Sequence, residues 1–66
     1  MFIEFDGTLI NVNAISQVMA VKENNEYIIR IFRIDGSWMA SEKFTEPAKS
    51  VDRFAEIKNI LLAKEN

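Results

Sequence analysis

Apolar and polar residues alternate along most of the chain, in short runs that are separated by turn residues, and this pattern predicts strands. The longest run, residues 25–38, carries four isoleucines, a phenylalanine and a tyrosine. Successive side chains of a strand point to opposite faces of its sheet, and here both faces are largely apolar. The two faces consist of Tyr27, Ile29, Ile31 and Arg33, and of Ile28, Arg30, Phe32 and Ile34. The run is therefore predicted to be a central strand that needs cover on both sides.

Two short apolar runs near the start of the chain flank Asp6-Gly7. An Asp-Gly pair favours the two-residue type I′ turn of a β-hairpin, because both residues of that turn need positive φ. We predict a hairpin in which Ile3 is opposite Ile10. In this register the side chains that face the core are Ile3, Phe5, Ile10 and Val12.

The segment after this hairpin predicts a corner and a third strand. Asn11 and Asn13 favour hydrogen bonds between side chain and local backbone, so we expect a corner or a single helical turn there. Alternation from residue 15 to residue 22 predicts the third strand. The polar stretch 23–26 predicts either a tight turn with two asparagines at positive φ, or a wider loop that separates its two glutamates.

The second glycine of the chain also follows an aspartate, in Asp35-Gly36. A two-residue turn at this pair predicts a further hairpin and places Arg33 opposite Trp38. The guanidinium of Arg33 is then expected to lie over the indole ring. Both glycines of the chain thus fall in turns between strand-like runs, which supports a meander of strands.

The last third of the chain predicts a helix over about residues 48–63. Pro47 cannot donate to a strand ladder but is tolerated in the first turn of a helix. Apolar residues then recur at helical spacing, at Val51, Phe54, Ile57, Ile60 and Leu61. The predicted fold class is α+β, with a small antiparallel β-meander of about five strands, over about residues 2–43, followed by one C-terminal helix packed on the sheet.

Length and composition limit this fold to one domain, residues 1–66, with a thin margin of stability. The chain contains no Cys and no His, which excludes a disulfide and an ordinary zinc site, and we expect neither a metal nor a cofactor. No segment has the pattern of a signal peptide or a membrane span. We therefore expect a cytoplasmic protein without a membrane partner, of bacterial or phage origin.

The composition argues against an enzyme. Without His and Cys, the commonest general base and the thiol nucleophile are missing. Asp6 and Asp35 are the obvious carboxylate pair, but each already has a role in an Asp-Gly turn. We therefore expect no enzymatic activity, no catalytic residues and no small-molecule substrate.

The charge balance disfavours a nucleic acid as partner, because eight basic and ten acidic residues give a net charge of −2. Basic and aromatic residues do occur together along the central strand. Alternation, however, puts Arg30 with Phe32 on one face. It puts Arg33 on the other face, with Tyr27 and Trp38.

One helix can cover only one apolar face of the central strand. The other face is covered either by the first hairpin, if the sheet curls, or by another chain. Exposed apolar patches usually mark contacts between proteins. We take the face that carries Trp38 as the interface, with the residues Tyr27, Ile29, Ile31, Arg33 and Trp38.

These inferences together predict a small non-enzymatic protein-interaction module. Its expected partner is a second copy, which would make it a homodimer, or another protein. Two other functions stay open. One is a nucleic-acid-binding regulator that uses Arg33, Trp38 and the basic residues around Arg53. The other is a phage-type inhibitor whose carboxylates imitate a nucleic acid.

The order of these signals along the chain resembles that of the short FlbD-like flagellar proteins of Gram-positive bacteria. The resemblance rests on the two Asp-Gly turns, on Leu9-Ile10-Asn11 followed by Ile15, on the apolar central strand and on the C-terminal helix. It implies a small cytoplasmic protein with a role around flagellar motility and no catalysis. The segment from Ile15 to Phe54 is also similar to the β-rich LytTR DNA-binding domain.

Overall fold

The computed structural model describes residues 1–64, in which five strands precede one helix, and the predicted α+β class is confirmed. The strands pair antiparallel, but they form two sheets instead of one continuous meander. One sheet contains β1 and β2, and the other has the order β3-β4-β5. The elements are β1 (Phe2–Phe5), β2 (Thr8–Asn11), the 3₁₀ turn η1 (Val12–Ala14), β3 (Ile15–Glu23), β4 (Glu26–Arg33), β5 (Trp38–Phe44) and α1 (Pro47–Lys64).

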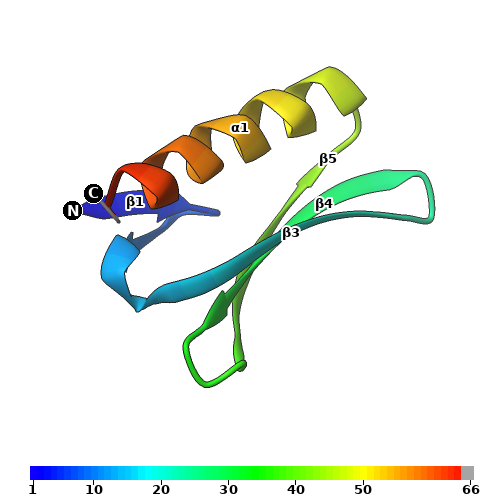
Figure 1. Cartoon of the computed structure of the whole chain (residues 1–66). Helices are drawn as coiled ribbons and strands as arrows, with labels where there is room; N and C mark the ends of the chain where they lie inside the picture. Colours follow the sequence, from blue (N-terminus) through cyan, green and yellow to red (C-terminus); the bar gives the residue numbers. More distant parts are fainter. Residues whose placement is uncertain (65–66) are drawn as a thin grey trace.

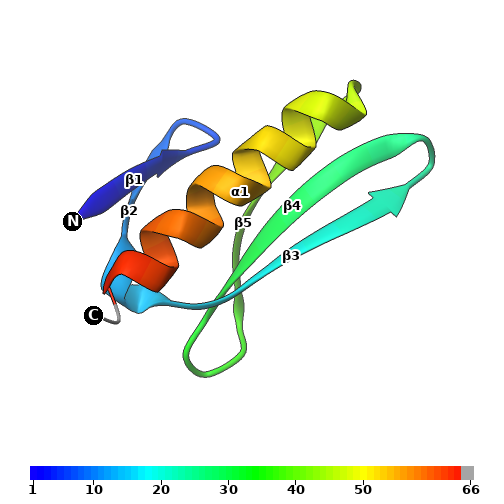
Figure 2. The same ribbon diagram turned by 45° about the horizontal axis from the view of Figure 1, so that its top comes forward.

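The helix α1 lies on one side of the three-stranded sheet (Figure 1). The first hairpin lies beside the helix, next to β5 (Figure 2). Pro47 is the first residue of α1, where its missing N–H removes no helical hydrogen bond. The Ser50 hydroxyl donates to the Pro47 carbonyl at 2.8 Å within the first turn. The helix is one residue longer at each end than the predicted range 48–63.

The register of the first hairpin is confirmed. Ile3 is opposite Ile10, and the turn residues Asp6 and Gly7 have φ values of 51° and 79°. The type of turn that the Asp-Gly pair favours is therefore the one that forms. All four side chains predicted to face the core are buried: Ile3, Phe5, Ile10 and Val12.

A single helical turn forms the predicted corner between the two sheets. The Asn11 side chain accepts a hydrogen bond of 2.9 Å from the Asn13 N–H, as expected for an asparagine that competes with a strand ladder. The Val12 N–H donates to the Met1 carbonyl at 3.0 Å and so holds the start of the chain against the corner.

The polar stretch between β3 and β4 forms the tight turn, and the wider loop is excluded. Asn24 and Asn25 have φ values of 50° and 66°, and Glu23 is directly opposite Glu26. The two like charges are tolerated because Glu23 forms an ion pair with Arg30, at 2.7 Å.

The turn between β4 and β5 is wider than predicted. The Arg33 N–H donates to the Ser37 carbonyl at 2.9 Å, so four residues lie between the strands. Gly36 alone has positive φ, at 88°, whereas Asp35 accepts a hydrogen bond of 2.8 Å from the Ser37 N–H. Hydrogen bonds from the hydroxyl and the N–H of Ser37 lower the pKa of Asp35 below its usual value. The aspartate therefore acts through its side chain and not through positive φ.

The wider turn brings a register shift that corrects the predicted pairing. Ile31 is opposite Ala40, but Phe32 is opposite Trp38, and Arg33 is opposite Ile15. Trp38 therefore shares a face with Phe32 and not with Arg33. The predicted pairing of Arg33 with Trp38, and with it the stacked guanidinium, is wrong.

One core joins both sheets to α1. Its buried side chains are Ile3, Phe5, Ile10, Val12, Ile15, Ile29, Ile31 and Ile57. Ile29 and Ile31 thus face the same cluster as the first hairpin and the helix residue Ile57. The first hairpin extends the core on the helix side, so it does not cover the other face of β3-β4-β5.

The positive φ of Gly7 predicts a specific cost of substitution. Gly7→Ala should lower the free energy of unfolding by about 1 kcal/mol, because an alanine in the left-handed region is strained. A new Cβ there meets no atom within 4 Å, so crowding adds nothing. Gly7→Asn should cost less, because asparagine tolerates positive φ. Urea unfolding measures both variants, and equal losses would contradict the backbone explanation.

Candidate functional site

The five residues predicted as one interface do not form one exposed face. Ile29 and Ile31 are completely buried beneath α1. Tyr27 is half-buried, Arg33 is exposed, and Trp38 is 59% exposed on the opposite face of the sheet. The predicted interface is therefore corrected. Its residues Ile29 and Ile31 belong to the face that α1 covers, and Trp38 belongs to the opposite face. Periodicity showed two apolar faces on the central strand but did not show which of them α1 packs on.

The exposed face of the three-stranded sheet, opposite α1, is the candidate site, and we call it the outer face. The strand registers place Gln17, Phe32 and Trp38 in one row across it. Met19 lies in the next row, opposite Arg30, and is 38% exposed. Phe32 is half-buried between its neighbours. Large apolar side chains therefore gather at the end of the outer face near the β4-β5 turn.

The other end of the outer face carries an ion pair. The Arg30 Nη2 atom lies 2.7 Å from Glu23 Oε1. Arg30 and Glu23 belong to different residue pairs of the β3-β4 ladder. The pair formed by Val21 and Ile28 lies between them on the same face. The aliphatic part of Arg30 can lie over this pair of residues. Ile28 is only 5% exposed, which agrees with such cover. The chain thus covers this half of the outer face with its own side chains.

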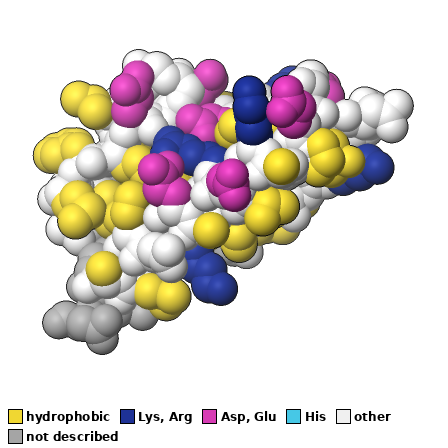
Figure 3. Space-filling model, turned by 90° about the horizontal axis from the view of Figure 1, so that it is seen from above, with side chains coloured by type: hydrophobic (Ala, Val, Ile, Leu, Met, Phe, Trp, Pro, Cys, Tyr) yellow, Lys and Arg dark blue, Asp and Glu magenta, His cyan; other side chains and the backbone are white. Residues whose placement is uncertain are grey.

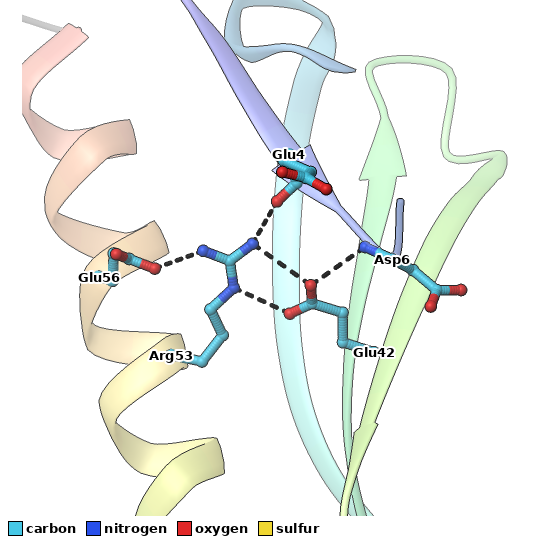
Figure 4. A network of polar contacts seen from close by, with 5 residues as sticks. All are labelled: Glu4, Asp6, Glu42, Arg53 and Glu56. Atoms are coloured by element: carbon cyan, nitrogen blue, oxygen red, sulfur yellow. Dashed lines mark hydrogen bonds and ion pairs between the residues drawn. The ribbon is translucent and has the colours of Figure 1, made fainter. Parts of the chain in front are cut away.

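A second polar cluster, which we call the Arg53 clasp, lies at the junction of helix and sheets (Figure 4). Arg53 Nε donates to Glu42 Oε1 at 2.8 Å, and Nη1 donates to Glu56. Nη2 donates to the Glu4 carbonyl of β1 and, at 3.3 Å, to Glu42 Oε2. The same carboxylate accepts a hydrogen bond of 3.1 Å from the Asp6 N–H. One arginine thus connects α1, β5 and the first hairpin.

The clasp is well shielded from water. The side chains of Arg53 and Glu42 are 19% and 18% exposed, and the guanidinium lies 5.4 Å from the centre of the Phe5 ring. The hydrogen bonds that Arg53 donates to Glu42 and to Glu56 raise the pKa of Arg53. Because carboxylate and carbonyl oxygens occupy its donors, this guanidinium is poorly placed to bind an external anion. The clasp is best explained as a structural contact.

The alternation in β5 contained a sign of this clasp that the sequence reasoning missed. Glu42 is opposite Ile29 and lies between Ala40 and Phe44 on the face that packs against α1. A carboxylate among core positions needs a cationic partner. The helix that packs on this face supplies that cation in Arg53, and Glu56, one helical turn further on, is a second acceptor for it.

Charges of both signs are mixed over the helix side of the molecule. The view from above shows basic, acidic and hydrophobic side chains interspersed there, without a large area of one sign (Figure 3). Arg30 and Arg53, two of the cations that a nucleic-acid face would use, are already paired with carboxylates. Within residues 1–64, no cluster of acidic side chains fits a metal ion. No helix in that range is long and apolar enough to cross a membrane.

Fold and surface together define a small α+β domain whose three-stranded sheet has a face that no described element covers. Comparison with protein-family models, with curated proteins and with solved structures finds no match for this chain. The geometry of the outer face is therefore the main indication of what this protein binds.

The clasp predicts a large difference between two neighbouring substitutions. Arg53→Met keeps the aliphatic stem but leaves the shielded Glu42 carboxylate without its cation, so unfolding should become easier by about 2 kcal/mol. Glu56→Gln removes an exposed partner and should cost no more than about 0.5 kcal/mol. Thermal or urea unfolding at neutral pH compares the two, and similar losses would show that Glu42 does not depend on Arg53.

Proposed function

We propose that this protein is a non-enzymatic protein-interaction module that self-associates through the outer face. The observation that carries the proposal is the 59% exposed Trp38, which lies beside Phe32 on a sheet face that no described element covers. Tryptophan is the residue type most enriched among those that dominate binding energy at protein interfaces. An exposed tryptophan on an open sheet is therefore the strongest sign of a contact in this chain.

The size of the outer face supports the same proposal. Three strands about 4.8 Å apart, each with about seven residues at ~3.3 Å, give a flat footprint of roughly 330 Å². Its apolar end, with Trp38, Phe32 and Met19, takes up about half of this area, and exposed apolar patches mark contact sites. Self-association also suits a 66-residue chain, because a domain this small buries little surface on its own.

The order of turns, strands and helix supports a second part of the proposal. It resembles the order in the FlbD-like flagellar proteins, and this resemblance implies a cytoplasmic bacterial protein that acts by contact and not by catalysis. The residue types agree with this view, because the chain has neither His nor Cys to serve as general base or nucleophile.

Substitution of Trp38 tests the proposal. Trp38→Ala should raise the protein concentration needed for self-association about 30-fold, as expected for a residue at the centre of an interface. Light scattering over a concentration series measures the effect. In the parent protein, fluorescence of this single tryptophan should shift to the blue as the chains associate.

The matched control is Val51→Ala. Val51 is 64% exposed and lies on α1, on the other side of the sheet from Trp38, so its loss should leave contact through the outer face unchanged. Circular dichroism verifies that both variants stay folded. A parent protein that remains a monomer at millimolar concentration, or a folded Trp38→Ala variant that associates like the parent, would contradict the assignment.

A further inference from the structure

The edge of the three-stranded sheet offers a second contact surface, formed by β3. This strand pairs with β4 on one side, and no strand within residues 1–64 pairs with its other side. Alternate backbone N–H and C=O groups of an edge strand point away from the sheet. Beyond the irregularity between Ile15 and Gln17, β3 pairs with β4 without interruption as far as Glu23. The result is a long, regular row of backbone donors and acceptors.

The other sheet borders are protected, whereas β3 is not. The edge strand β2 has only four residues. The free side of β5 lies near β1, where the Asp6 N–H donates to Glu42. Natural edge strands usually contain proline or charged residues, which prevent pairing with a strand of another molecule. Between Gln17 and Val21, β3 contains neither.

The area of the outer face is a separate reason to look for a second contact. Two flat footprints of roughly 330 Å² each sum to roughly 660 Å², from the strand spacing and rise. A specific interface needs about 1,000 Å² in total. Pairing along β3 would add both area and backbone hydrogen bonds.

We propose that β3 pairs antiparallel with β3 of a second copy, about a two-fold axis at Met19. The proposal rests on the proposed self-association but uses a different surface. With the axis at Met19, the regular residues 17–21 of the two strands overlap, Val18 is opposite the partner's Ala20, and Gln17 is opposite the partner's Val21. Paired residues then belong to the same face of the sheet, as an antiparallel ladder requires.

The same register keeps like charges apart. Lys22 and Glu23 lie beyond the regular overlap, next to the partner's irregular residues Ile15 and Ser16. No charged residue of β3 therefore faces another of its own sign. A two-fold axis perpendicular to the sheet also leaves both helices on one side and both outer faces on the other. The dimer is a six-stranded sheet, and contact through the outer faces joins two such dimers into a tetramer.

The test uses Trp38→Ala as background, because this substitution removes the contact through the outer face and leaves β3 unchanged. Light scattering should report a dimer. Amide hydrogen exchange should be slow at every residue from 17 to 21 at high protein concentration. On dilution below the dissociation constant, every second amide should become fast, because only alternate N–H groups bond to β4.

Two substitutions at Ala20 then locate the contact. Ala20 is exposed, and across the proposed axis the two Ala20 side chains are diagonal neighbours about 7–8 Å apart. Ala20→Glu should raise the dimer dissociation constant about fivefold or more at low salt, with a smaller effect at high salt. Ala20→Gln, of nearly the same size but uncharged, should change it less than about twofold. Slow exchange in α1 and β4 verifies the fold of both variants.

The outcomes separate this inference from the proposed function. Alternating exchange along β3 at every concentration, or a dimer that responds equally to glutamate and glutamine at position 20, would overturn the β3 contact. Slow exchange at every amide of residues 17–21 in a monomer would also overturn the β3 contact, because the free edge of β3 would then be protected by the same chain. Failure of Trp38→Ala to reduce the mass of the assembly would count against the outer face and not against β3.

Discussion

The fold depends on the packing of α1 against two sheets that share no ladder of hydrogen bonds. The first hairpin pairs only within itself, and the three-stranded sheet begins after a single helical turn. What holds them together is the common core, in which Phe5 and Ile29 are completely buried together with Ile57 of the helix. Each sheet alone is too small to bury its apolar face, so the helix makes one domain out of both.

Polar contacts reinforce this junction at one point. Glu42 lies on the core side of β5, where an unpaired carboxylate would be costly. Arg53 satisfies it from α1 and at the same time holds a carbonyl of β1. The clasp thus ties the hairpin, the sheet and the helix in a defined arrangement. It also uses the best-shielded cation of the described chain for structure.

The outer face is uncovered because the helix and the first hairpin both pack on the opposite side of the sheet. Once α1 and the first hairpin have both packed on one side of β3-β4-β5, no described element remains for the other. The ion pair between Arg30 and Glu23 spans one half of that face, while Trp38 and Met19 stay exposed on the other half. The core and the proposed contact therefore use opposite sides of the same strand, with Ile29 and Ile31 inside and Phe32 outside.

Local chemistry allowed the elements to be predicted from the sequence alone. Turn residues such as Asp6-Gly7 act through their own backbone preferences, and the helical spacing of apolar residues needs no partner to be recognised. The sequence did not predict which face of β4 is covered by α1. Both faces of this strand are apolar, and only packing in three dimensions selects one of them. The register shift that places Trp38 beside Phe32 depended on a wider turn around Asp35. Burial of Ile29 and exposure of Trp38 were therefore decided by tertiary structure, since periodicity reports alternation but not what lies above each face.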